Sequence, residues 1–308
     1  MYLSPTTHDW QLVSHNSQAM AIPCTNVAAE RSPVSHYVFM FPEDIAREIL
    51  ELSARAHRDM APQLIKLNRQ VQRWIEPVLY ETVHLVNILK ALRFIYAIRT
   101  KPPALFTRVK YLTISFCVGT DLAYQIIPHC PRVRELACWV PNVTSIPGFT
   151  NLNPQHLLMH LNSGNDSGRM KPDFGQVLYS SVTRLAFTDP CRVWTHWEGF
   201  SKLSNLTHLK LEWVYPCPFE YKHILSDILH SCKHLKILLL MLGLPMLRDP
   251  VIAIPSGLDV MGDPRVVVIQ MNRVFLVSER ADGTNPRLWK KAEEILSAQY
   301  EKVRVKAK

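Results

Sequence analysis

The chain has 308 residues, of which 47% are hydrophobic and 20% charged, so it can bury a core and make one large or two smaller domains. No apolar run reaches the roughly 18 residues of a membrane span. The N-terminus lacks the basic and apolar regions of a secretory signal, and seven cysteines without a CxxC pair indicate a reducing compartment. We therefore expect a protein of the cytoplasm, the nucleus or both, with no membrane partner.

The net charge of +9 raises the question of nucleic-acid binding. Residues 287–308 hold seven basic and three acidic residues, whereas residues 41–90 hold seven of each sign. The remaining excess lacks the stripe of aromatic and basic residues that single-strand binders use. We interpret the C-terminus as a solvated basic tail and do not expect a nucleic-acid partner.

Residues 1–36 are polar and without periodicity, which predicts a disordered arm. The next stretch, residues 41–85, reads as three short helices. Pro42 suits the first position of a helix, and Pro62 marks a second helical start. Pro77 is expected to end or kink the third helix. The apolar residues at helical spacing are Ile45, Ile49 and Leu52, then Leu64, Ile65 and Leu67, then Val71, Trp74 and Ile75.

These segments together resemble an F-box, and most closely the F-box-like proteins of fungi. The resemblance rests on Phe41-Pro42, the face Ile45/Ile49/Leu52, Leu64-x-x-Leu67, Asn68-Arg69 and Val71-x-x-Trp74. The family pattern usually opens with Leu-Pro, where this chain has Phe41-Pro42. The resemblance implies docking onto a Skp-type adaptor of a cullin-RING ubiquitin ligase, with the rest of the chain presenting an unidentified protein substrate. The implied adaptor-binding residues are Phe41, Pro42, Ile45, Ile49, Leu52, Leu64, Leu67, Val71 and Trp74.

A second interpretation stays open. Three short helices bury little apolar area, so they need something to pack against. They would then form only the N-terminal cap of a repeat scaffold for protein–protein interaction, with no ligase role.

Internal repetition begins at Val109. The pattern apolar-x-x-apolar-x-apolar recurs at starts 24, 49, 24 and 29 residues apart, within the range of leucine-rich repeats once a poor copy fills the longest gap. The full copies are Val109/Leu112/Ile114, Val133/Leu136/Cys138, Val182/Leu185/Phe187, Leu206/Leu209/Leu211 and Leu235/Leu238/Leu240, with partial copies at Leu157/Met159 and Val267/Ile269. The pattern predicts parallel strands of an irregular leucine-rich-repeat-like solenoid.

The chain also aligns with itself at an offset of 102 residues, which places residues 126–136 on residues 228–238. Helix end, cysteine (Cys130 and Cys232) and strand start recur in the same order. We predict helices over 121–129 and 221–231 that lead into these strands, each unit burying its apolar face against a neighbour.

Further elements complete the predicted fold. Strands are expected at 82–85 and 274–277, a helix over 87–99 and a turn at Asp282-Gly283. A helix over 286–300 should cover the open end of the repeats, with Trp289 as its main buried contact. The fold class is α/β, with an arm (1–36), an F-box-like helical module (37–86), the solenoid (87–270) and a C-terminal cap with basic tail (271–308).

Side chains between the buried strand positions should face outward and form the binding surface. We predict Trp139, Glu212 and Met241 as substrate-binding residues. The opposing interpretation, that loops cover these side chains, stays open.

No catalytic residue, cofactor or metal is predicted. His156 and His160 have the i, i+4 spacing of a helical metal site, but in a strand they lie about 13 Å apart. Cys232 belongs to the repeat, which explains the cluster His230/Cys232/His234 as packing. Glycine-rich and nucleophile motifs are absent from the sequence, so we expect a non-catalytic binding protein.

Overall fold

The computed structural model describes residues 41–140, 146–160, 173–188, 199–213, 221–244, 263–272 and 286–306. The chain divides into two compact units, Met1–Glu43 and Asp44–Lys308, and nearly all described residues belong to the second. The predicted N-terminal arm, the strand at 274–277 and the turn at Asp282-Gly283 lie outside the described residues.

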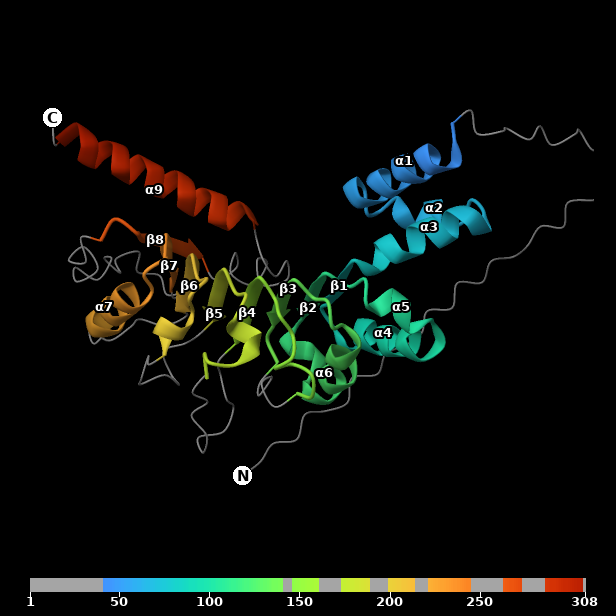
Figure 1. The fold of residues 1–308 in the computed structure, drawn as a ribbon, viewed down its shortest axis with the longest axis horizontal. Coiled ribbons are helices and arrows are strands. Elements are labelled where there is room, and N and C mark those ends of the chain that lie inside the picture. Colours follow the sequence, from blue (N-terminus) through green and yellow to red (C-terminus); the bar gives the residue numbers. More distant parts are fainter. Residues whose placement is uncertain are drawn as a thin grey trace, which may run out of the picture. The chain divides into compact units, whose positions relative to one another are not determined.

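Eight parallel strands form one sheet in which every strand pairs with its neighbours in chain order (Figure 1). The strands are β1 (Thr82–Leu85), β2 (Tyr111–Ile114), β3 (Glu135–Cys138), β4 (His156–His160), β5 (Arg184–Thr188), β6 (His208–Trp213), β7 (Ile237–Leu244) and β8 (Val266–Asn272). The α/β class and the strand positions predicted from the repeated pattern are confirmed. The sheet begins at β1, earlier than the predicted boundary at residue 87.

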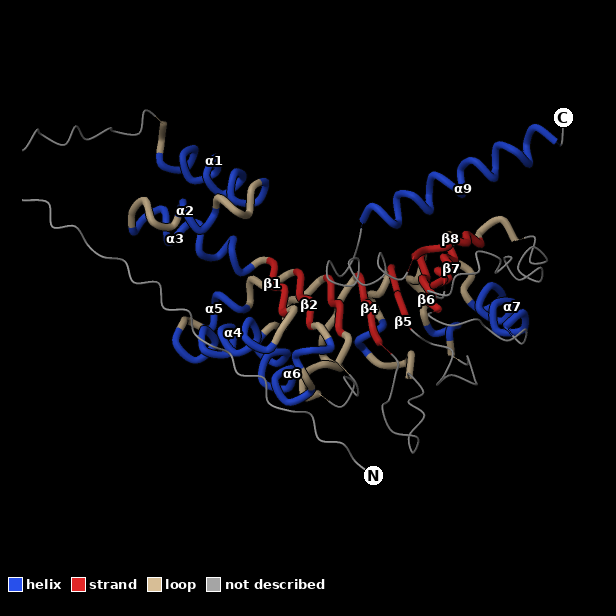
Figure 2. The backbone as a smooth tube through the Cα atoms, turned by 180° about the vertical axis from the view of Figure 1, so that it is seen from behind, coloured by secondary structure: helices blue, strands red, loops and turns tan. Residues whose placement is uncertain are grey.

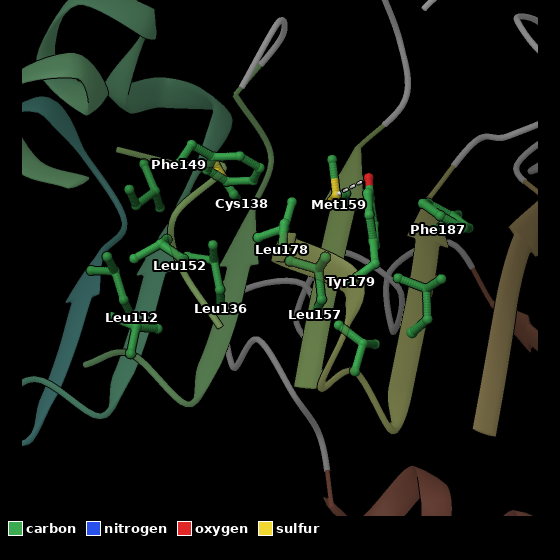
Figure 3. Close-up of a cluster of buried hydrophobic side chains, with 14 of the residues drawn as sticks. Leu112, Leu136, Cys138, Phe149, Leu152, Leu157, Met159, Leu178, Tyr179 and Phe187 are labelled. Atoms are coloured by element: carbon green, nitrogen blue, oxygen red, sulfur yellow. Dashed lines mark hydrogen bonds between the residues drawn. The ribbon is translucent and has the colours of Figure 1, made fainter. Parts of the chain in front are cut away.

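The repeated apolar positions line up across the sheet. Leu112, Leu136, Leu157, Leu185, Leu209 and Leu238 are register partners from strand to strand. All six belong to the main core, and Figure 3 shows the central part of this core. There the hydroxyl of Tyr179 donates a hydrogen bond to the sulfur of Met159 at 3.8 Å. The repeat positions therefore share one face of the sheet because side chains alternate along each strand.

The predicted register of β8 is wrong by one residue. Val266 and Val268 pair with Leu238 and Leu240, and both pack against the main core. The pattern instead assigned Val267 and Ile269, which lie in a second cluster. A shift of one residue moves every side chain of a strand to the opposite face. Val266 and Val268 therefore face the main core, and the predicted pair Val267 and Ile269 faces the opposite side of the sheet.

Helices precede, connect and follow the strands. The α-helices are α1 (Glu43–Ala56), α2 (Ala61–Leu64), α3 (Arg69–Tyr80), α4 (Ile88–Thr100), α5 (Pro103–Phe106), α6 (Thr120–Ile126), α7 (Tyr221–Ser231) and α9 (Pro286–Lys306). The 3-10 helices are η1 (Phe116–Val118), η2 (Ile127–His129), η4 (Val177–Tyr179) and η6 (Phe200–Lys202). In both views α4, α6 and α7 lie along one face of the sheet and α9 along the other (Figures 1 and 2). The two faces are therefore covered by different helices.

Local sequence explains where two of these helices begin. Asn68 caps α3 by accepting a hydrogen bond from the Val71 amide at 2.8 Å, and Asn87 caps α4 through the Lys90 amide at 2.9 Å. Pro77 was predicted to end or kink α3, and it does not end the helix, which continues to Tyr80. None of the helices in the described ranges has the length and apolar character that crossing a bilayer would need.

Candidate functional site

α1 presents a stripe of large apolar side chains to solvent. Ile45, Ile49 and Leu52, with Phe41 just before the helix, are between 41% and 57% exposed. The spacing of Ile45, Ile49 and Leu52 places these three on one side of the helix, while Ala46 and Ala54 are buried. Alanine lets α1 pack closely on its neighbours. The larger residues remain at the surface, where contiguous apolar groups mark interaction sites.

A small core supports this stripe. Its buried members are Ala54, Ala61, Val71, Ile75 and Val78, with half-buried Leu50, Leu64, Ile65, Trp74 and Leu79 around them. Of the nine predicted adaptor-binding residues, Phe41, Pro42, Ile45, Ile49, Leu52 and Leu67 are exposed, and Leu64 and Trp74 are half-buried. Val71 is only 1% exposed. Its role is therefore to hold α3 in this core, and it cannot contact a partner directly.

Charged side chains connect α1 to the start of the sheet. Arg55 of α1 binds Glu51 at 3.1 Å and Glu81 at 3.2 Å, and Glu81 also binds Lys110 at 3.0 Å. Burial acts to raise the pKa of Glu81, but the hydrogen bonds and positive charges of Arg55 and Lys110 outweigh it and lower that pKa. Glu81 thus stays ionised and anchors α1 to the residue before β2.

Aromatic packing links α3 to the helices that follow. The rings of Tyr80 and Phe106 meet edge to face with centroids 5.4 Å apart, and those of Phe94 and Phe106 do so at 5.6 Å. Such pairs add to the stabilisation from burial alone. Tyr80, in the last turn of α3, therefore packs against the main core next to β1 and β2.

The three predicted substrate-binding residues are not at the surface. Trp139, Glu212 and Met241 are 5%, 1% and 1% exposed, so the expectation that they are exposed is wrong. The opposing interpretation predicted burial but assigned the cover to loops, whereas Met241 lies in a cluster with the helix α9. Trp139 packs with Ala137, Leu158 and Ala186. Within the described part of the chain, its indole nitrogen has no hydrogen-bond acceptor.

α9 covers Met241. A second cluster joins Leu288, Trp289 and Ala292 of α9 to the β7 residues Ile237, Leu239 and Met241 and the β8 residues Val267 and Ile269. The predicted burial of Trp289 is confirmed, but α9 packs on a face of the sheet rather than only across its open end. The sequence did carry a signal for this, since the unbroken apolar run Ile237–Leu242 is typical of a strand buried on both faces.

Polar residues form a row on the same face, which the sequence analysis missed. Glu135, His156, Arg184 and His208 are successive register partners. His156 and Glu135 approach to 3.0 Å. Acidic and basic side chains facing each other across strands stabilise a sheet modestly. In this row, Glu135 and His156 join β3 to β4 beside the apolar cluster around Trp139.

The histidine and cysteine clusters show no metal-site geometry in the described residues, where no group of three or more potential ligands converges. His156 and His160 lie in β4, as predicted, and His160 bonds to Thr188 at 2.9 Å. Cys130 and Cys232 are both buried, as their repeated position predicted. Comparison with known protein families, curated proteins and solved structures finds no match to this chain.

Proposed function

We propose that this protein is a substrate-recognition subunit of a Skp-cullin-F-box type ubiquitin ligase. In this proposal α1, α2 and α3 form an F-box-like module that docks onto a Skp-type adaptor. The strands and the helices between them form an irregular leucine-rich-repeat-like solenoid that binds a protein substrate. The chain itself carries out no catalysis.

The exposed stripe Ile45/Ile49/Leu52 carries this proposal. A stripe of three large apolar residues on one helix is costly to leave in water, at about 25 cal/mol for each Å² of apolar surface. The other side of α1 is already packed, so the stripe is available for a partner helix or groove. These are the positions at which the resemblance to an F-box places adaptor contacts.

The parallel strands support the second half of the proposal. Each strand pairs with the next in chain order, and the leucines of successive copies are register partners. Stacked units of this kind bury a continuous core that no unit could form alone. Since Trp139, Glu212 and Met241 are buried, the substrate surface must use other residues.

The test is a binding measurement with purified Skp-type adaptor and the full-length chain. We expect a complex for the wild type, and at least tenfold weaker binding for the triple variant Ile45→Ser/Ile49→Ser/Leu52→Ser. All three side chains are exposed, so the variant should melt like the wild type. Val177→Ser, at another exposed apolar side chain, is the matched control. A wild-type chain that never binds the adaptor would refute the proposal.

One observation favours the alternative, a repeat scaffold whose N-terminal helices only cap the sheet. Tyr80 and Glu81 join the end of α3 to the residues around β1 and β2. Hydrogen exchange on the full chain separates the two functions. A cap should open together with β1 and β2 at one free energy, whereas a docking module should open at a lower free energy than the sheet.

A further inference from the structure

α4 exposes a second apolar stripe, remote in sequence from the one on α1. Ile88, Leu89, Leu92 and Tyr96 are between 47% and 70% exposed. Residues spaced by three and four lie side by side on a helix, so these four form one continuous strip. Ala91, Phe94 and Ile95 of α4 are buried in the main core. The helix is thus fixed in place, and the strip faces outward.

Phe116 adds a fifth apolar group. It extends from η1, which contacts α4, and it is 72% exposed. An aromatic ring exposed to this degree contributes little to folding. A residue of this type at the edge of an apolar strip is a frequent anchor in protein interfaces.

The charge around this strip is strongly positive. α4 contains no acidic residue, and its basic residues Lys90, Arg93 and Arg99 are all exposed. Residues 86–134 contain eight basic residues and one acidic residue, and two of the basic residues, Lys101 and Lys110, pair with Glu76 and Glu81. Arg99 bonds to the uncharged Gln125 at 3.2 Å. No carboxylate in the described ranges pairs with Lys90, Arg93 or Arg99.

We propose that α4, with Phe116 beside it, is a docking surface for an acidic amphipathic helix of a partner protein. Ile88, Leu92 and Tyr96 form an i, i+4, i+8 ridge, which fits a groove on another helix. Glutamate or aspartate beside the partner's apolar residues would meet Arg93 and Arg99, each three residues from Tyr96 on α4, and speed association. This surface is separate from the stripe on α1 and does not depend on the proposed adaptor.

Two other occupants fit less well. Nucleic acid would use the positive charge and the rings of Tyr96 and Phe116, but the aliphatic side chains of Ile88, Leu89 and Leu92 neither stack on bases nor bond phosphates. An anionic membrane would use both charge and apolar groups, but membrane-surface helices bury a broad apolar face. One side of α4 is buried in the core, so only a narrow apolar strip is exposed to a membrane.

The experiment uses the full-length protein and two fluorescent helical peptides. One has leucine at every third or fourth position and glutamate elsewhere, and the other has lysine in place of each glutamate. We expect the acidic peptide to bind, with an affinity that falls as salt is raised, and the basic peptide not to bind. Leu92→Ser/Tyr96→Ser and Arg93→Glu should each weaken binding of the acidic peptide at least tenfold.

Controls match each change. Val177→Ser removes an exposed apolar side chain from η4, and Lys233→Glu reverses an exposed charge after α7. Both should bind the acidic peptide like the wild type, and every variant should melt like the wild type. All α4 variants should also bind the Skp-type adaptor as the wild type does, so this inference and the proposed function can fail separately.

Three results would overturn the inference. The first is equal binding of the acidic and basic peptides, and the second is wild-type affinity in the α4 variants. The third is that the acidic peptide does not bind, while single-stranded RNA or phosphatidylserine vesicles do. In that case the substitutions at Leu92, Tyr96 and Arg93 would weaken the binding of the RNA or the vesicles. That outcome would assign the surface to nucleic acid or to a membrane.

Discussion

The imidazole of His208 in β6 meets the indole of Trp289 in α9 edge to face, with ring centroids 5.2 Å apart and planes at 84°. Glu293, one turn further along α9, places its Oε1 atom 3.5 Å from Nε2 of the same imidazole. His208 therefore joins α9 to the sheet at the margin of the apolar cluster beneath that helix. Together these contacts make α9 part of the folded core rather than an appended tail.

Replacing Trp289 with alanine should destabilise the protein strongly. The indole is buried against β7 and β8, and removing a buried aromatic side chain costs about 3–5 kcal/mol. Urea unfolding of Trp289→Ala, compared with the exposed neighbour change Lys290→Ala, measures this cost. The control should lie within about 0.5 kcal/mol of the wild type. Equal free energies of unfolding for the two variants would show that α9 does not contribute to the core.

His208 should make stability fall as the solution becomes more acidic. Burial is the main cause that lowers its pKa from 6.5, and the positive charges of Arg184 and Lys236 add to it, while Glu293 acts in the opposite direction. Below pH 6.5 the unfolded chain therefore binds more protons at this site than the folded chain. Stability contributed by the neutral imidazole is complete above 6.5 and is lost as the pH falls through the lowered folded pKa.

The measurement is the free energy of unfolding of the wild type and His208→Gln at a series of pH values from about 7.5 to 5. Other histidines and carboxylates titrate in both proteins, so only the difference between the two curves reports on His208. We expect the wild type to lose more stability than the variant over this interval. Parallel curves would mean that His208 titrates normally in the fold.

The buried pair Lys210 and Glu212 should be costly to break and tolerant of joint replacement. The Nζ and Oε2 atoms are 3.4 Å apart, and the side chains are 11% and 2% exposed. Glu212→Leu alone leaves a buried ammonium without this carboxylate and should cost about 3–5 kcal/mol. The double change Lys210→Met/Glu212→Leu should recover most of that loss. A double-mutant cycle by urea unfolding tests the coupling, and an additive result would contradict it.

Cysteine reactivity should follow burial. Burial raises the pKa of Cys130 and of Cys138 to about 12 and that of Cys232 to about 11, whereas Cys117 is exposed. The thiolate is the reactive form, so these three buried thiols should be nearly inert at neutral pH. Among these four cysteines, peptide mapping after brief alkylation should find Cys117 modified first, and the other three only in denaturant. Early modification of Cys138 in the Cys117→Ser variant would show that the sheet opens locally.

The sequence alone predicted one face of the sheet well. Leucines at the repeated positions alternate with other residues, and a period of two assigns them to a common face without knowledge of the rest of the fold. β8 is the exception because Val266, Val267, Val268 and Ile269 are all apolar. Alternation carries no information in such a run, so the pattern chose the wrong pair.

The candidate site was predicted only in part. The spacing of Ile45, Ile49 and Leu52 identified a shared side of α1, but a helical period does not say whether that side faces a core or solvent. The same limit applied to α4, where Ile88, Leu89, Leu92 and Tyr96 form an apolar strip that the structure leaves exposed. Only the packing of Ala46 and Ala54, and of Phe94 and Ile95, decides which side of each helix is inside.

The sequence by itself determined the class of the fold, the order of its strands and the residues that share the leucine-bearing face, because these follow from local periodicity and from repetition along the chain. Only the tertiary structure decided whether the other face of the sheet is buried or exposed. Met241 and Trp289 are more than forty residues apart in sequence, yet they belong to one buried cluster. Period-two alternation predicts which side chains share a face of the sheet. Whether that face is buried at Met241 depends on α9, a helix that is distant in sequence.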